Sequence, residues 1–174
     1  MHTPLFDKEK IYQDLNDKGI EYKVFEHPPV FTVEEAELYT KDIDGVHIKN
    51  LFVYDKKKNM WLITIPHDIR PDLKKVKAVL GTSGNLSFCN PDRLWENLGV
   101  KPGSVTPLSV VNDTNGNVTA VIDKSCTTEE LVCPHPLLND ATVQMKGTDL
   151  IEYMKSYNHE PMIIDFKNED LLQD

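Results

Sequence analysis

The sequence predicts a single α+β domain, and three observations lead to this class. At 174 residues the chain has the length of one domain with its own core. Its composition, with 40% hydrophobic and 27% charged residues, is that of an ordinary globular protein. Segments with helical and strand patterns follow one another without regular βαβ alternation, which favours an α+β domain with a mixed sheet.

Helices are predicted where apolar residues recur at helical spacing between a capping residue and a stop signal. The first covers 7–18, with Ile11 and Leu15 on its apolar face. Thr32 is the predicted N-cap of a helix that reaches residue 38, and Glu35 completes a capping box with it. The remaining predicted helices cover 71–80, 91–98, 148–157 and a short stretch at 128–131.

Strands are predicted where β-branched and aromatic residues cluster between turn residues. The runs 50–54 and 60–65 are separated by a polar turn and form a hairpin, and 105–111 pairs with 118–122 across a turn-rich linker. Further strands are expected at 22–25, 142–145 and 162–164. These elements place the domain within 1–166 and leave 167–174 as a frayed, acidic C-terminal tail.

Composition also excludes several classes of protein. No apolar run approaches the roughly 18 residues that a membrane span needs, and the first seven residues lack the basic start and apolar stretch of a signal peptide. The three cysteines, Cys89, Cys126 and Cys133, contain no CxxC pair, so neither a disulfide framework nor a metal site is expected. We therefore expect a cytoplasmic protein without a membrane partner.

Charge is unevenly spread along the chain, whose formal net charge is −9 at pH 7. The window from Lys49 to Lys77 holds eight basic and three acidic residues and so carries +5, against −14 elsewhere. A local basic surface on an acidic protein can bind phosphates with marked salt dependence, although lysines in a hairpin turn and on a helix face are often merely solvated. The candidates for phosphate binding are Lys56, Lys57, Lys58, Arg70, Lys74, Lys75 and Lys77.

Three short features combine polar chemistry with a constrained backbone. Lys49 opens an otherwise apolar strand, where its ammonium group is costly to bury unless it is paired or used, or else reaches the surface. Gly103 begins a Gly-Ser-Val-Thr-Pro turn, whose free N–H groups could polarise a carbonyl or which simply redirects the chain. His135 lies between two prolines that fix where its imidazole points, toward a substrate or toward a neighbouring element that it caps. If the three converge, they suit hydrolysis of an activated ester by positioned water.

Other catalytic arrangements find no support in the sequence. The stretch 81–85 contains two glycines but lacks the spacing of a phosphate loop and follows a predicted helix. A serine hydrolase would need a GxSxG elbow, which is missing. Cys89 follows Phe88 and is more typical of a core residue than of a nucleophile.

Taken in order, several segments resemble the YbaK/prolyl-tRNA-synthetase-associated superfamily of aminoacyl-tRNA editing domains. The ordered set spans the chain from about residue 5 to 165 and is most similar to the freestanding ProX/PrdX-type alanyl-tRNA(Pro) deacylases. The matching segments are EHPPVFT at 26–32, KNLF at 49–52, LSF at 86–88, LGVKPGSVTP at 98–107, VND at 111–113, HPL at 135–137 and NDAT at 139–142.

The resemblance implies a mixed, barrel-like β-sheet flanked by helices, with no cofactor or metal. It implies that Lys49 holds the acceptor end of a tRNA, with Asn50 beside it. The turn at Gly103 would face the terminal adenosine and the aminoacyl carbonyl, and His135 would orient the same group. The residues expected to contact the substrate are Phe31, Thr32, Val33, Leu51, Ser104, Val105, Thr106, Pro107 and Pro134.

The implied activity is hydrolysis of mischarged alanyl-tRNA(Pro), with the acceptor stem and its 3′ aminoacyl-adenosine as partner and prolyl-tRNA synthetase as a further candidate. With tRNA as the partner, the seven phosphate-binding candidates between Lys56 and Lys77 become the predicted tRNA-binding residues. Such an enzyme is needed because a hydrophobic pocket discriminates by only about 1–3 kcal/mol per methylene, so a prolyl synthetic site also admits alanine. Water aided by the substrate's ribose hydroxyl needs only positioning and oxyanion support. Two alternatives stay open: a deacylase for cysteinyl-tRNA(Pro) or another small aminoacyl-tRNA, and a non-catalytic regulator of the same fold that binds tRNA or an amino acid.

Overall fold

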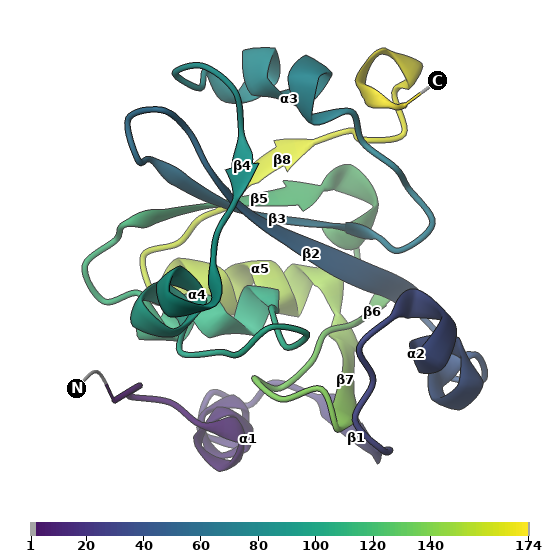
Figure 1. Cartoon of the computed structure of the whole chain (residues 1–174). Coiled ribbons are helices and arrows are strands. Elements are labelled where there is room, and N and C mark those ends of the chain that lie inside the picture. The colour runs from purple at the N-terminus through teal and green to yellow at the C-terminus, as the bar shows by residue number, and fades with distance from the viewer. Residues whose placement is uncertain (1–2, 174) are drawn as a thin grey trace.

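The structure is a computed structural model that describes residues 3–173, with one mixed sheet at its centre (Figure 1). The strands are β1 (Tyr22–Glu26), β2 (Val46–Tyr54), β3 (Met60–Pro66), β4 (Ser87–Phe88), β5 (Val118–Asp123), β6 (Leu131–Cys133), β7 (Ala141–Lys146) and β8 (Met162–Ile164). Their order across the sheet is β1-β7-β6-β2-β3-β5-β8, and β4 pairs with β2. The predicted α+β domain with a mixed sheet is confirmed.

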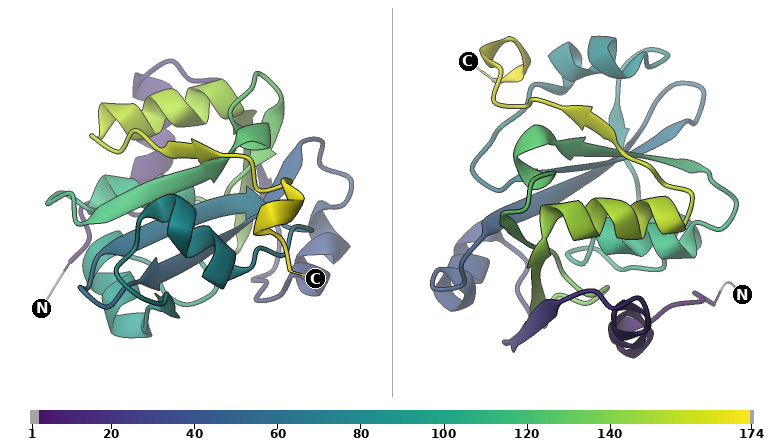
Figure 2. Two further views of the ribbon diagram at one scale, coloured as in Figure 1. Left: turned by 90° about the horizontal axis from the view of Figure 1, so that it is seen from above. Right: turned by 180° about the vertical axis from the view of Figure 1, so that it is seen from behind.

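Helices cover the sheet on both sides (Figure 2). The α-helices of the described residues are α1 (Lys8–Asp17), α2 (Val33–Thr40), α3 (Leu73–Leu80), α4 (Pro91–Leu98) and α5 (Gly147–Ser156), and the 3₁₀ helices are η1 (Pro107–Asn112), η2 (Lys124–Cys126) and η3 (Glu169–Leu171). In Figure 1, α3 and the C-terminal segment lie above the sheet, while α4 and α5 lie below it. Within residues 3–173, no helix is long and apolar enough to cross a membrane.

Each side of the central strands buries its own apolar cluster. Phe52 and Leu62 point toward the cluster that contains α4 and α5, whereas Val53 and Ile63 point toward the cluster that contains α3. Successive side chains of a strand point to opposite faces, so the even-numbered residues of β2 belong to the α4/α5 side and the odd-numbered ones to the α3 side. This alternation decides how β2 contributes to the candidate site.

Two sequence-based predictions about secondary structure are wrong. The run 105–111 is not a strand, because Thr106 caps η1 by accepting a hydrogen bond from the main-chain N–H of Leu108. The run is apolar because η1 is fully buried. No helix covers 128–131; the chain there leads into β6, and the nearby helical turn is η2. Hydrophobicity alone did not separate a buried 3₁₀ turn from a buried strand.

The C-terminal segment is not frayed over its described residues, 167–173. Leu171 is buried against the α3 side of the sheet, and Leu172 pairs with Pro71 in an isolated β-bridge. The main-chain N–H of Gln173 donates to the carbonyl of Arg70 at 3.0 Å. The prediction of a frayed tail relied on the acidic composition of this segment and overlooked Leu171 and Leu172, which hold it in place. Whether the domain boundary lies at residue 166 stays a prediction.

His159 and Asp113 form a buried pair behind η1. The Nε2 atom of His159 lies 2.8 Å from Oδ2 of Asp113, and Nδ1 lies 2.6 Å from the carbonyl of Tyr157. Burial alone would lower the pKa of His159, but the hydrogen bonds to Asp113 and Tyr157 outweigh burial and raise the pKa above 6.5. The charged ring therefore stabilises the fold fully below pH 6.5, and this contribution is lost as the pH rises through the folded-state pKa.

We expect Asp113→Asn to destabilise the protein most at low pH. Removing one member of a buried ion pair costs roughly 3 kcal/mol or more, and the deficit should shrink at high pH, where the ring is neutral in both proteins. Urea unfolding at pH 5.5 and pH 9 measures the loss in free energy of unfolding at each pH. Asp123→Asn is the matched control, because this buried carboxylate accepts from the N–H groups of Ser125 and Phe166 and contacts no histidine. A deficit for Asp113→Asn that is equal at both pH values would contradict the charged pair.

Candidate active site

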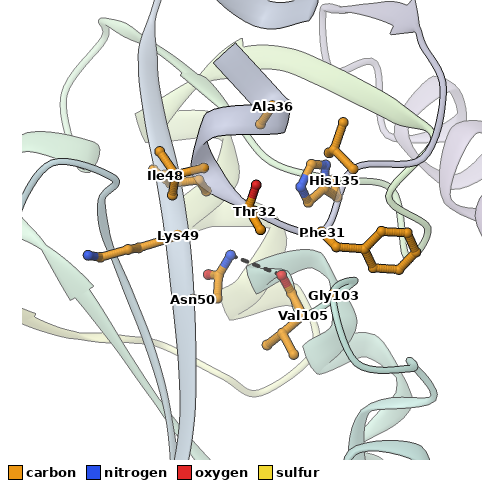
Figure 3. A pocket seen from close by; sticks show the side chains of 11 residues that line it. Phe31, Thr32, Ala36, Ile48, Lys49, Asn50, Gly103, Val105 and His135 are labelled. Carbon is orange, nitrogen blue, oxygen red and sulfur yellow. Dashed lines mark hydrogen bonds between the residues drawn. The ribbon is translucent and has the colours of Figure 1, made fainter. Parts of the chain in front are cut away.

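A cavity of about 200 Å³ opens beside β2, between α2 and the turn at Gly103 (Figure 3). It is smaller than the roughly 300–1,000 Å³ typical of sites for drug-sized ligands. Its walls combine aliphatic side chains with a few polar groups and no carboxylate of the described residues. The lining residues are Val30, Phe31, Thr32, Val33, Ala36, Ile48, Lys49, Asn50, Gly103, Val105 and His135.

Most of the predicted site residues border this cavity. All four predicted catalytic positions do so, as do four of the predicted substrate contacts, namely Phe31, Thr32, Val33 and Val105. Ser104, Thr106, Pro107 and Pro134 are buried behind the wall and do not line it, and Leu51 lines a different cavity.

Sequence reasoning missed three lining residues, Val30, Ala36 and Ile48. Two of them follow from periodicity. Ile48 lies two residues before Asn50 on the same strand face, and Ala36 lies one helical turn after Thr32.

His135 presents a defined ring nitrogen to the cavity. Its Nδ1 atom lies 3.0 Å from the carbonyl oxygen of Ala141, which can only accept, so Nδ1 carries a proton. Burial lowers the pKa of His135 below its ordinary value of 6.5, and the nearby ring of His27 lowers it further. The ring is therefore neutral at pH 7, and its Nε2 atom is a hydrogen-bond acceptor.

Side-chain bonds tie the glycine turn to its neighbours. The Nδ2 atom of Asn50 donates to the carbonyl of Val105 at 3.0 Å, and its Oδ1 atom accepts from Oγ1 of Thr64 at 2.7 Å. Oγ1 of Thr106 donates to the carbonyl of His135 at 2.7 Å. The turn is thus fixed both to β2 and to the loop that carries His135. In this structure the amide of Asn50 positions the turn.

The segment that precedes α2 forms the outer wall. Asn139 donates from Nδ2 to the carbonyl of Val30 at 2.6 Å, and Thr32 caps α2 by accepting from the N–H of Glu35. Phe31 remains 67% exposed, and its ring lies directly over Gly103. A β-carbon at Gly103 would come within 2.9 Å of that ring, so the glycine is needed for this contact.

Lys49 behaves differently from the other predicted catalytic residues. It borders the cavity, but its side chain leaves β2 on the side opposite to Asn50 and His135 (Figure 3). This is the consequence of strand alternation, because an odd-numbered residue of β2 faces the α3 side. The glycine turn and the imidazole converge as expected, whereas the ammonium group does not join them.

The Lys49 side chain lines a second cavity, of about 340 Å³, together with Leu51 and Arg70. Burial lowers the pKa of Lys49, and the positive charge of Arg70 lowers it further, while Asp68 acts weakly in the opposite direction. Within residues 3–173, the Lys49 ammonium has neither a hydrogen bond nor an ion pair.

β2 also has an open edge beside the first cavity. On the side away from β3, β6 pairs with residues 46–47 and β4 with 53–54, which leaves 48–52 without a strand partner among the described residues. The carbonyl of His47 bonds to the β3 side, and that of Phe52 accepts from Cys89 on the opposite side. Because these directions alternate along a strand, the main-chain N–H of Asn50 points to the open edge. It is a candidate donor to a ligand.

The predicted tRNA-binding residues gather at the α3 end of the molecule. Lys56, Lys57 and Lys58 lie in the β2–β3 turn, which bonds to the loop after α3, and the others lie on or just before α3 (Figure 1). Some of their donors are used internally, since Lys77 bonds to Asn85 and Lys75 to the carbonyl of Leu172. A role in tRNA binding stays a prediction.

Comparison with known proteins connects this geometry to a family. The Aminoacyl-tRNA editing domain family matches residues 27–153. Prolyl-tRNA synthetase associated domain-containing protein 1 of Mus musculus is 38% identical over 163 residues, covering 91% of this chain and 96% of the relative. Prolyl-tRNA editing protein ProX of Acetoanaerobium sticklandii is 36% identical over 152 residues, covering 86% and 91%.

The fold has counterparts among solved structures. A crystal structure described as "a putative trans-editing enzyme for prolyl tRNA synthetase" superposes with a TM-score of 0.70 at 21% identity, covering 98% of this chain and 99% of the other. At this level of identity the likeness concerns the fold alone. Within residues 3–173, no three histidine, cysteine, aspartate or glutamate side chains are grouped so as to hold a metal ion.

We expect Gly103→Ala to disturb the site more than the fold. Gly103 and Gly116 both have positive φ, +87° and +68°, so alanine at either position should cost about 1 kcal/mol of stability. Only at Gly103 would the new methyl group meet the ring of Phe31; at Gly116 nothing lies within 4 Å. Urea unfolding should give similar losses, while NMR shifts of the Phe31 ring should change only in Gly103→Ala. An unchanged Phe31 ring in that variant would refute the contact.

Proposed function

Because the chain belongs to the aminoacyl-tRNA editing domain family, we propose that it is a trans-editing hydrolase that deacylates mischarged alanyl-tRNA(Pro). The observation that carries the proposal is the small cavity in which the neutral imidazole of His135 faces the turn at Gly103. The similarity to ProX, whose name specifies prolyl-tRNA editing, supports the same reaction class.

The lining of the cavity suits a small apolar amino acid. Val33, Ala36 and Ile48 form an aliphatic wall around a volume of about 200 Å³. In the proposal this wall accepts the methyl group of alanine and excludes the larger ring of proline. Cysteine carries one sulfur atom more than alanine, and an apolar pocket discriminates against so small an addition by only roughly 1–3 kcal/mol, so cysteine is the natural competitor.

The proposed reaction needs no protein nucleophile. Water attacks the carbonyl carbon of the ester, the bond to the ribose oxygen breaks, and the products are the free amino acid and tRNA with its hydroxyl restored. The Nε2 atom of His135 accepts a hydrogen bond from the attacking water or from the neighbouring ribose hydroxyl, which orients it. The main-chain N–H of Asn50 and the glycine turn supply donors for the oxyanion. No cofactor enters these steps.

The tRNA acceptor stem is the proposed partner, approaching from the α3 end. The β2–β3 turn and α3 place six lysines there, close to the side of β2 that carries Lys49. Lys49 is proposed to hold the RNA backbone rather than the ester, because its side chain lies across β2 from His135. Prolyl-tRNA synthetase, which appears in the names of the relatives, is a further proposed partner.

We expect the purified protein to shorten the lifetime of alanyl-tRNA(Pro) and to leave prolyl-tRNA(Pro) intact. The assay follows radiolabelled amino acid on mischarged tRNAs, with cysteinyl-tRNA(Pro) as the third substrate and protein-free samples as baseline. Faster hydrolysis of cysteinyl-tRNA(Pro) than of alanyl-tRNA(Pro) would identify the cysteinyl ester as the substrate. Binding of all three tRNAs without any change in ester lifetime would identify a non-catalytic module and refute the enzyme.

We expect single-turnover deacylation to fall as the pH drops below the lowered pKa of His135, because protonation removes the Nε2 acceptor. His135→Asn keeps a donor toward Ala141 but lacks that acceptor, and should lose roughly 100-fold or more in rate. His47→Asn is the control, because Nε2 of His47 bonds to the carbonyl of Ile43 and the residue does not line the cavity. Full activity in His135→Asn would refute the proposed role of Nε2 of His135 as a hydrogen-bond acceptor.

A further inference from the structure

The second cavity, on the α3 side of β2, has no role in the mechanism above. It measures about 340 Å³, larger than the first, and its lining joins two cationic side chains to an aromatic ring. The lining residues that matter here are Lys49, Arg70, Phe88 and Gln173. They come from four separate segments, so the fold brings them together from distant parts of the sequence.

Lys49 and Arg70 line the same cavity, and among the described residues the one carboxylate that acts on the Lys49 charge, Asp68, does so only weakly. Neither the ammonium of Lys49 nor the guanidinium of Arg70 has a hydrogen-bond or ion-pair partner within residues 3–173. Lys49 is half-buried, and burial is the largest cause of its lowered pKa. The positive charge of Arg70 lowers this pKa further, so the two side chains are close enough for their charges to repel. Bringing like charges together is unfavourable unless an anion joins them, and a phosphate between an ammonium and a guanidinium relieves the repulsion.

Phe88 supplies a flat surface at the same cavity. It lies in β4, and its side chain is 62% exposed even though it pairs with Val53 in the sheet. An exposed aromatic ring beside a cationic groove is the arrangement on which nucleic-acid bases stack. Phosphate-binding cations and a stacking surface together match one nucleotide better than a free anion.

The backbone around Arg70 is braced. The main-chain N–H of Gln173 donates to the carbonyl of Arg70 at 3.0 Å, and Nε2 of Gln173 donates to the carbonyl of Pro71 at 3.2 Å. The C-terminal segment thereby fixes the start of the Arg70 side chain next to the cavity. Because the main chain is already fixed there, only the Arg70 side chain has to lose conformational entropy when it binds a phosphate.

The two cavities adjoin the same open edge of β2. Lys49 borders both, and residues 48–52 have no neighbouring strand on that edge among the described residues. A single extended ligand can therefore pass over the edge, with one end in each cavity. The 3′ end of a tRNA is such a ligand, because an aminoacyl group at its terminus is followed by single-stranded nucleotides.

We propose that the cavity of Lys49, Arg70 and Phe88 is a nucleotide subsite, which takes the phosphate and the base of a nucleotide upstream of the terminal adenosine. The proposal rests on the proposed function for the orientation of the RNA. The cations hold the phosphate, and Phe88 stacks on the base without reading its sequence. The subsite thus supplies affinity for RNA, while the first cavity selects the amino acid.

The test compares binding of the uncharged trinucleotide CCA, adenosine and cytidine monophosphate to the full chain by NMR titration. The trinucleotide should bind at least tenfold more tightly than either fragment. Phe88→Ala should weaken trinucleotide binding at least fivefold, whereas Phe88→Trp should retain it. Arg70→Gln should weaken it and lower the slope of log affinity against log salt by about 0.7. Adenosine binding should not change in any of these variants.

Two variants serve as matched controls, Lys23→Gln for the loss of a charge and Ile163→Ala for the loss of an exposed apolar side chain. Both positions are exposed and lie outside the two cavities, so neither should affect the trinucleotide. Equal loss for trinucleotide and adenosine, no loss in either test variant, or equal loss in the controls would overturn the subsite. Cytidine monophosphate bound as tightly as the trinucleotide would also overturn it, in favour of a site for free nucleotides.

Failure of the proposed function would look different. A protein that binds the trinucleotide as described but hydrolyses no aminoacyl ester would refute the enzyme and support the subsite. Active protein whose Phe88→Ala and Arg70→Gln variants bind the trinucleotide normally would refute the subsite and leave the enzyme in place.

Discussion

The arrangement of both cavities depends on one constraint, the two-residue period of β2. Neighbours on a strand must project to opposite faces, so Lys49 and Asn50 are separated by the thickness of the sheet although they are adjacent in sequence. The edge of the strand is uncovered between β4 and β6, so a ligand can reach both of its sides there. A third strand paired along residues 48–52 would cover this edge and occupy the N–H of Asn50.

The first cavity is held in shape mainly by polar contacts around its rim. Asn50 fixes the carbonyl of Val105, Thr106 fixes that of His135, and Asn139 fixes that of Val30. Each bond joins segments that are far apart in the sequence. The hydrophobic clusters lie deeper and set the positions of the strands and helices. Apolar packing therefore positions the strands and helices, and hydrogen bonds from a few side-chain amides and hydroxyls position the loops around the cavity.

Much of this was accessible from the sequence, for physical reasons that differ between elements. α1, α2 and α4 have capping side chains that mark their starts, and β2 and β3 are joined by a polar turn, so local chemistry sufficed. The prediction that His135 and Gly103 lie at one site came from the resemblance to the family. That Lys49 and Asn50 project to opposite faces follows from strand alternation and was within reach of the sequence. The contribution of Gln173 depends on long-range docking, which no local pattern contains.

The proton on Nδ1 of His135 is directed by the carbonyl of Ala141, which belongs to the backbone. A backbone acceptor is encoded by the path of the chain and not by the side chain at that position. Mutational drift at residue 141 can therefore exchange one small side chain for another without altering the tautomer. The reactive face of the imidazole is sensitive instead to insertions, deletions and prolines that reroute the loop between β6 and β7.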